Sequence, residues 1–206
     1  MLFVNEKIKR TIDSLKKNHI NARYFENEET AVDFILDEIH INDKVGIGGS
    51  MTISQLELPQ LLEARGNIVY FHWLKTTSEE MDEARKMASH ADVYLTSTNA
   101  LTEKGQLVNI DGTGNRVASM IFGPKKVFVI CGVNKITEDI DKALIRIKEN
   151  AYKNARRLNL NTPCAITGKC NDCDSPQRMC NVTTIIEKKL NKTDLQVIII
   201  DKELGY

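Results

Sequence analysis

Apolar residues recur three and four positions apart in some segments and form short continuous runs in others, and the two patterns alternate along the chain. Residues 5–18 and 28–39 show the first pattern, which predicts amphipathic helices, and Asn27 precedes the second as a helix cap. The short runs predict buried strands. They lie at 22–25, 43–47, 67–71, 92–95, 106–110, 126–131 and 195–200.

Further helices are expected between these runs. Residues 56–65 form one, interrupted by Pro59, and residues 116–121 another. Thr77 and Glu80 have the spacing of a capping box, which predicts a helix start. A long amphipathic helix is expected to open at Thr137 and Asp141 and to extend to Leu158, and residues 182–190 are also expected to be helical. The alternation predicts one α/β domain over residues 1–206, with a mostly parallel sheet covered by helices on both faces.

Cysteine is concentrated near the C-terminus, in a loop expected at 160–183. Cys164, Cys170, Cys173 and Cys180 have the spacing C-x5-C-x2-C-x6-C among Gly, Pro, Asn and Asp. Four thiolates in such a loop can surround one metal centre, and soft sulfur ligands select zinc or iron–sulfur. The compact spacing favours a 4Fe-4S cluster, whereas the absence of a C-x2-C-x2-C run keeps zinc as the alternative. Redox-active thiols are a third interpretation.

The charge balance narrows the possible partners. The chain of 206 residues has 28 Lys and Arg against 28 Asp and Glu, so its net charge does not suit a dedicated nucleic-acid binder. Its longest apolar runs are too short to cross a bilayer, and the first residues show no apolar export signal. We expect a cytoplasmic homodimer without membrane or nucleic-acid partners. Cys131, which closes an apolar run, is expected in the core.

The segment VGIGGSMT, residues 45–52, joins a predicted strand to a predicted helix through glycines. Backbone N–H groups that converge at such a turn suit an anion. The alternative is a tight turn that requires small residues. The glycines do not have the spacing of a dinucleotide or nucleotide fingerprint.

The segment DGTGNR, residues 111–116, follows another predicted strand. Polar side chains at strand ends are where open α/β sheets bind ligands. Arg116 is suited to hold a carboxylate or phosphate, and Asp111 to accept a hydroxyl hydrogen or act as a base. The alternative is a turn in which Arg116 pairs locally. No histidine is assigned a role, and charges at 148–157 are interpreted as a solvated helix face.

Taken together, VGIGGSMT, LVNIDGTGNRVA, GPKKVFVICGVNKI and TPCAITGKCNDCDSPQRMCN make the chain resemble the lactate-utilisation (LUD) domain family over residues 5–202. Within it the sequence is similar to lactate-utilisation protein C and looks like a short branch with a C-terminal four-cysteine motif. The resemblance implies a Rossmann-like sheet similar to those of glucosamine-6-phosphate deaminase, ribose-5-phosphate isomerase and the coenzyme A transferases.

The resemblance also implies where a ligand binds. By position, a small anionic metabolite, either a carboxylate or a sugar phosphate, would lie over the glycine turn and the loops at the strand ends. The implied residues are Gly48, Gly49, Ser50, Asn99, Asp111, Gly112, Thr113, Gly114, Asn115, Arg116 and Lys135. No catalytic residue follows from the resemblance, so the question of enzymatic activity stays open.

Three functions follow as hypotheses, and the third, an isomerase, deaminase or transferase acting on a phosphorylated sugar or acyl-CoA, rests on fold analogy alone. The first is an iron–sulfur accessory or redox component of lactate (2-hydroxy acid) utilisation, since the resemblance implies a role near the oxidation of lactate to pyruvate beside other redox proteins. The second is a small-anion binding module in which the four cysteines hold structural zinc. Four protein ligands leave no open coordination position on zinc, so the second hypothesis predicts a metal that stabilises the protein without catalytic turnover.

Overall fold

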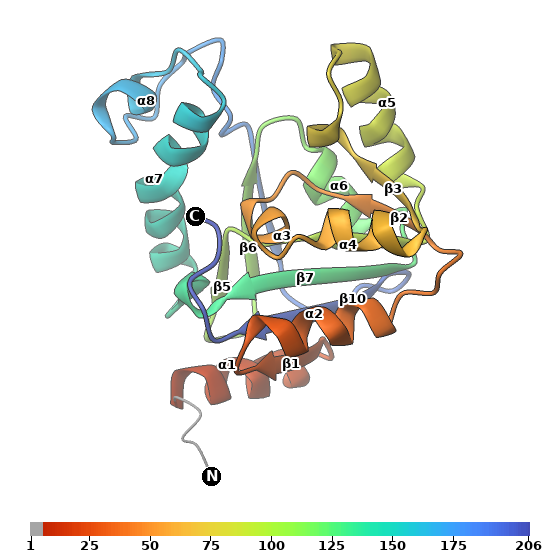
Figure 1. Ribbon diagram of the computed structural model, residues 1–206. Coiled ribbons are helices and arrows are strands. Elements are labelled where there is room, and N and C mark those ends of the chain that lie inside the picture. The colour runs from red at the N-terminus through yellow and green to blue at the C-terminus, as the bar shows by residue number, and fades with distance from the viewer. Residues whose placement is uncertain (1–5) are drawn as a thin grey trace.

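The computed structural model describes residues 6–206 and confirms the predicted α/β architecture (Figure 1). Within those residues the main sheet has six strands, all parallel, in the order β1-β10-β7-β4-β2-β3. This is a Rossmann-like sheet. Its strands are β1 Asn21–Phe25, β2 Lys44–Ile47, β3 Ile68–Phe71, β4 Val93–Thr96, β7 Lys126–Gly132 and β10 Asp194–Ile200.

Helices cover both faces of this sheet. One face packs against α1, α5 and α6, and the opposite face packs against α2, α3 and α4. Their bounds are α1 Glu6–Lys17, α2 Glu28–Asp37, α3 Met51–Gln55, α4 Leu58–Arg65, α5 Ser78–Ser89 and α6 Asn115–Ile121. No helix among residues 6–206 is long and apolar enough to cross a membrane.

The central strand β7 shows why its sequence is a continuous apolar run. Val127, Val129 and Cys131 point to the first face, while Phe128 and Ile130 point to the second, and all five are fully buried. A strand covered on both sides has no polar positions to alternate with. The placement of Cys131 in the core is confirmed, and each aliphatic or aromatic side chain contributes about 1.5–3 kcal/mol by burial.

A second sheet lies beside the first. It has the order β8-β5-β6-β9, with β5 Ala100–Thr102 and β6 Leu107–Asp111 forming a hairpin through the turn at Gly105. The long helix α7 Ile140–Arg157 packs on this sheet through Ala143 and Ile147. The other two strands are β8 Ile136–Thr137 and β9 Val182–Ile186.

The second sheet corrects two predictions. Residues 182–190 were expected to be helical, but β9 pairs antiparallel with β6 along its whole length, and its residues VTTII are mostly β-branched. The long helix begins at Ile140 with Asp139 as its cap, because Thr137 belongs to β8.

The helix expected at 56–65 is also corrected. Pro59 lies in the first turn of α4 and so separates α3 from α4, where one interrupted helix was expected. The caps at Asn27 and Thr77 are confirmed.

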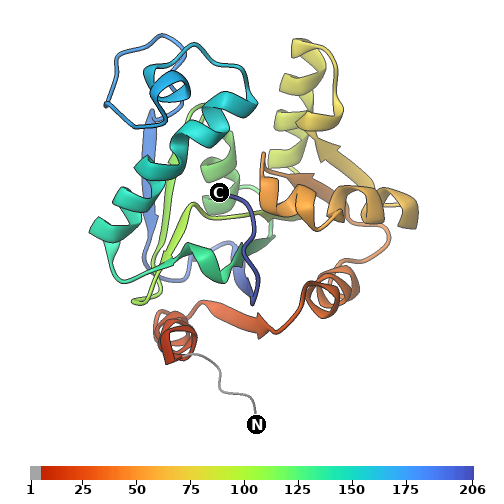
Figure 2. The ribbon, with the colours of Figure 1, turned by 60° about the vertical axis from the view of Figure 1, so that its left-hand side comes forward.

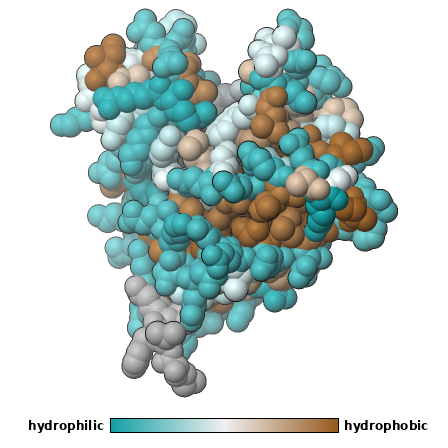
Figure 3. Space-filling model, in the orientation of Figure 1, coloured by the Kyte–Doolittle hydropathy of each residue, from teal (hydrophilic) through white to brown (hydrophobic). Residues whose placement is uncertain are grey.

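Two projections rise from the carboxyl edge of the main sheet. One is α5, and the other is the end of α7 with the short helix α8 Pro163–Thr167, as two views show (Figure 2). Their surfaces leave a hollow between them (Figure 3). The hollow is the mouth of a cavity that residues of α5 and α7 line from opposite sides.

Candidate functional site

The cavity between α5 and α7 lies at the carboxyl ends of the strands and has a volume of about 490 Å³. Five of the strands contribute residues to it: Ser50 after β2, His72 after β3, Asn99 after β4, Asp111 at the end of β6 and Lys135 after β7. In parallel α/β sheets this edge is the usual place of a ligand. The volume is within the range of about 300–1,000 Å³ that small-molecule sites span.

The residues that the resemblance implies for ligand binding meet at this cavity. The lining includes Gly49, Ser50, Asn99, Asp111, Gly112, Thr113, Asn115, Arg116 and Lys135. Gly48 and Gly114 do not line it. A Cβ at Gly48 would lie 2.9 Å from the Tyr94 hydroxyl, so neighbouring side chains favour glycine there, whereas Gly114 has φ 87°, a backbone conformation that favours glycine.

Arg116 is the centre of a buried hydrogen-bond network and is 8% exposed. Its Nη1 donates to the Ser97 carbonyl at 2.9 Å and to Asn109 Oδ1 at 2.6 Å. Its Nη2 donates to Asn99 Oδ1 at 2.9 Å, and its Nε lies 3.8 Å from Asp111 Oδ2. The guanidinium is therefore engaged by the protein on every side. This geometry matches local pairing, the alternative to direct ligand contact, and it fixes the loops that do face the cavity.

Asp111 is likewise held by its own backbone environment. Its Oδ1 accepts a hydrogen bond from the Gly112 N–H at 3.0 Å, and its Oδ2 accepts one from the Val117 N–H at 3.2 Å. The carboxylate thus satisfies a turn and the start of α6. It is also the one acidic side chain among the cavity-lining residues of 6–206.

Lys135 lies on the cavity wall and is 4% exposed. Its Nζ is 3.0 Å from Thr52 Oγ1 and 2.9 Å from Ser97 Oγ. The pKa of Lys135 is lowered to about 7, chiefly by burial; the Cys131 thiol opposes this shift, and Arg146 and Arg116 add to it. The amine is thus half deprotonated near neutral pH.

Sequence reasoning missed several residues that line the cavity. His72 and Trp73 follow β3, Arg85 comes from α5 and Arg157 from α7. The Arg157 guanidinium carbon lies 4.1 Å from the centre of the Trp73 ring. Burial, together with Arg85 and Arg157, lowers the pKa of His72 to about 4, so that its imidazole is neutral. The position of His72 directly after a strand could have indicated a site residue. The helical positions of Arg85 and Arg157 give no such indication.

The charges around the cavity are predominantly positive. Arg85, Arg116, Arg157, Arg178 and Lys135 line it, and among the side chains of residues 6–206 that line it only Asp111 is acidic. Charges in a partly desolvated cavity interact more strongly than charges in water. The cavity is therefore suited to a small anion.

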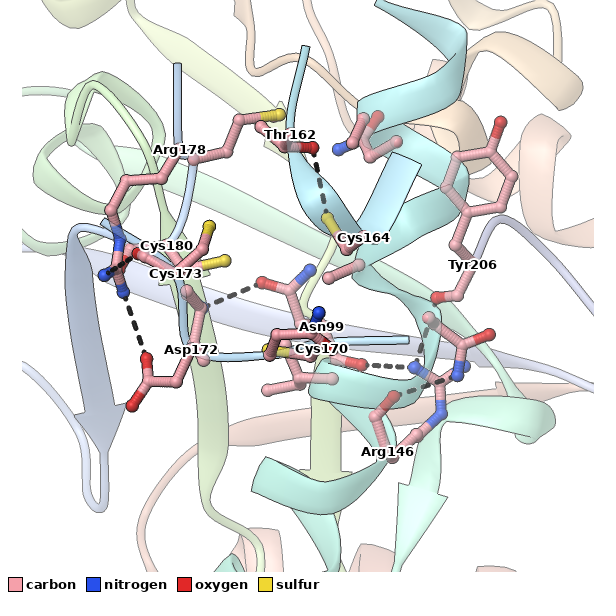
Figure 4. Close-up of a pocket in the computed structure, with 18 residues that line it drawn as sticks. Asn99, Arg146, Thr162, Cys164, Cys170, Asp172, Cys173, Arg178, Cys180 and Tyr206 are labelled. Carbon is pink, nitrogen blue, oxygen red and sulfur yellow. Dashed lines mark hydrogen bonds and ion pairs between the residues drawn. The ribbon is translucent and has the colours of Figure 1, made fainter. Parts of the chain in front are cut away.

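The four clustered cysteines line a second cavity of about 100 Å³ beside the first (Figure 4). All four are free thiols and partly buried. Burial and the neighbouring Cys170 raise the pKa of Cys180, Arg178 lowers it, and Cys164 and Cys173 raise it further. The four thiols are thus near enough to influence one another. The two cavities share a wall made of Asn99, Ile110, Asn154, Arg178, Met179 and Tyr206.

The cysteines suit a soft metal centre by their chemistry, since all four line one cavity, Cys164 from α8 and the other three from irregular backbone. Within residues 6–206, no three His, Cys, Asp or Glu side chains are placed as a group that could hold a metal ion. Cys164 instead lies with its sulfur 3.2 Å from Thr162 Oγ1. Binding a metal would therefore require the loop to bring the sulfurs together.

Arg178 fastens this loop to itself. Its Nη1 donates to the Cys173 carbonyl at 2.5 Å, and its Nη2 donates to the Cys180 carbonyl at 3.0 Å. The same Nη2 lies 3.4 Å from Asp172 Oδ1. Because Arg178 also lines the larger cavity, one side chain connects the cysteine loop to the candidate anion site.

Comparison with known proteins agrees with this architecture. The sequence model of the LUD domain matches residues 8–200. The fold is similar to the crystal structure of a DUF162 family protein from Deinococcus radiodurans, with a TM-score of 0.55 and 12% identity over 97% of this chain and 99% of that one. At that identity the likeness concerns the fold alone. No curated protein matches the sequence.

Proposed function

Because the chain belongs to the LUD domain family, which supports an association with lactate utilisation, we propose that it binds a small anionic metabolite beside an iron–sulfur cluster. The metabolite would occupy the cavity between α5 and α7, and the cluster would occupy the cysteine loop. One observation carries this proposal: a cavity lined by cationic side chains shares a wall with four free thiols.

The positions of two arginines support the proposed anion binding. Arg157 lies over Trp73 while its Nε and Nη2 donate to Asn154 Oδ1 at 3.0 and 2.9 Å, so its guanidinium is held in one orientation. Arg85 faces it from α5. Two arginines on opposite walls can bind the two ends of a carboxylate or phosphate ligand, and planar guanidinium groups favour such oxygens.

The four cysteines would hold the cluster, which when bound supplies one-electron transfer. Arg178 contributes positive charge beside the thiols, because its guanidinium donates to the carbonyls of Cys173 and Cys180. A cation at this position offsets the negative charge of four thiolates. Because the two cavities share lining residues, a metabolite bound in the larger cavity would lie next to the loop.

Metal analysis of anaerobically purified protein tests the cluster. We expect iron and sulfide, with absorbance at about 400 nm. Both should disappear in a Cys170→Ser/Cys173→Ser variant and persist in Cys131→Ala, whose thiol is in the core of the main sheet. Stoichiometric zinc without iron would reject the cluster and leave a structural zinc loop.

Calorimetry with lactate, pyruvate and phosphate tests the anion site. Arg157→Gln should weaken binding about tenfold, the loss expected for one charge-assisted hydrogen bond. Lys86→Gln is the matched control, since Lys86 is an exposed cation on α5 outside the cavity. The anion site is rejected if none of the three ligands binds, or if both variants weaken binding equally.

A further inference from the structure

We propose that Lys135 is a carbonyl-reactive lysine, whose amine forms a covalent imine with a small anion that carries an aldehyde or ketone. The inference deepens the proposed function, because it assumes that the anion occupies the cavity between α5 and α7. It assigns a reactive atom on that cavity's wall and a chemical class to its ligand.

Lys135 is rigidly placed at the edge of the cavity. It ends the short 3-10 helix Val133–Lys135 that follows the central strand β7, so its backbone is fixed by the core of the sheet. Its side chain is buried and yet borders the cavity. A nucleophile needs this combination of rigid placement and access to the ligand.

The hydrogen-bond partners of Lys135 are uncharged. Within the described part of the chain, the hydrogen-bond partners of its Nζ are two hydroxyl oxygens, those of Thr52 at 3.0 Å and Ser97 at 2.9 Å. Among residues 6–206 no carboxylate oxygen lies within 4.0 Å of it. An ammonium group buried without a counter-ion is costly, so the site favours the neutral amine, which is the nucleophilic form.

The charged groups around Lys135 act in the same direction. Its pKa is lowered to about 7 by burial, which the Cys131 thiol on β7 opposes and Arg146 on α7 and Arg116 on α6 reinforce. The pKa of Cys131 is itself raised to about 11 by burial, so this thiol is uncharged at neutral pH. Exposed lysines have a pKa of about 10.4 and remain almost entirely protonated there.

The reaction is balanced without an outside reagent. The Nζ lone pair attacks the carbonyl carbon, a C–N bond forms, and the carbonyl oxygen takes up a proton to give a carbinolamine. That hydroxyl then leaves as water while the nitrogen loses its second proton, so an amine and a carbonyl become an imine and one water. The Ser97 and Thr52 hydroxyls lie at hydrogen-bond distance from Nζ and can pass these protons.

The ligand is defined by shared chemistry. Arg85 and Arg157 require a carboxylate or phosphate, and Lys135 requires a carbonyl group. A 2-oxo acid and a ketose phosphate both meet these conditions, and the cavity of about 490 Å³ has room for either. The experiment must therefore include one of each.

Reductive trapping tests the proposal on the full chain. The protein is incubated with pyruvate or with dihydroxyacetone phosphate, sodium cyanoborohydride is added to reduce any imine, and the modified lysine is located by peptide mass mapping. We expect labelling of Lys135 at least about tenfold above any exposed lysine near pH 7.5, because only its amine is largely neutral there. Labelling should fall as the pH is lowered to about 6.

Two variants and one binding measurement separate the outcomes. Lys135→Arg should lose the adduct while it keeps a cation, and Lys148→Met, which removes an exposed lysine of α7, should keep the adduct. Wild-type mapping needs no variant, so a folding defect cannot hide the answer. Anion binding by calorimetry without enrichment at Lys135 overturns this inference alone. Absence of both binding and adduct overturns the proposed function with it.

Discussion

Replacing Lys135 by methionine should stabilise the protein near neutral pH and lose that advantage as the pH rises. Methionine keeps a long unbranched side chain and removes the amine. In the wild-type protein the amine has a pKa of about 7 when folded, against 10.5 when exposed. Between these values the unfolded chain binds more protons than the folded one, so wild-type stability rises with pH while the contribution of methionine stays constant.

The size of the effect follows from that difference in pKa. Near pH 7.5, burying the amine costs about 4 kcal/mol. Methionine avoids this cost but loses the contacts with Thr52 and Ser97, worth about 1 kcal/mol each, so the variant should be about 2 kcal/mol more stable. By about pH 9.5 the wild type should have gained about 2.5 kcal/mol relative to the variant, which removes its disadvantage.

Urea unfolding under reducing conditions, followed by circular dichroism at both pH values, measures this change. Other groups titrate in this range, but they do so in both proteins and cancel in the difference. Lys148→Met controls for loss of an exposed lysine and should show no pH-dependent difference. If the free-energy gap between wild type and Lys135→Met is the same at both pH values, the buried amine keeps its charge and the argument for its reactivity fails.

Three further predictions concern other parts of the site. Arg116→Met should reduce the free energy of unfolding by about 3 kcal/mol, since buried oxygens lose their donor; a loss below about 1 kcal/mol in urea unfolding would contradict its central role. Gly46→Ala should cost about 2 kcal/mol, measured the same way, because its Cβ would lie 2.4 Å from the Ala88 carbonyl oxygen; unchanged stability would refute this overlap. Trp73 is the one tryptophan of the chain and contacts Arg157, so anion binding should change intrinsic fluorescence; calorimetric binding without any such change would place the ligand elsewhere.

The main sheet could be predicted because its signals are local. Each buried strand is an apolar run, and caps such as Asn27 and Thr77 mark helix starts. The strand β9 was missed because its identity depends on pairing with β6, which is distant in sequence, and only its β-branched residues hinted at it. The register between such segments is not encoded in the periodicity of either one.

The candidate site likewise contains residues that local sequence signals predicted and residues that they did not. Residues after strands of the main sheet, such as Ser50 and Asn99, could be predicted to meet, since parallel strands bring their carboxyl ends to one edge. Arg157 was interpreted as part of a solvated helix face, whereas it lies over Trp73 on the cavity wall. The angle at which α7 crosses the second sheet decides this, and no pattern within the helix specifies that angle.

The side chain of Arg178 has a consequence for how the two cavities behave together. It borders both spaces, and it holds the backbone of the loop on which the four sulfurs lie. Any ligand that moves the Arg178 guanidinium changes the free energy of the cavity between α5 and α7 and of the cavity lined by the cysteines. Thermodynamic reciprocity then requires that filling one space alters affinity in the other by the same factor in either order. Whether the cavity lined by the four cysteines is occupied could thus be determined from the anion affinity of the larger cavity alone.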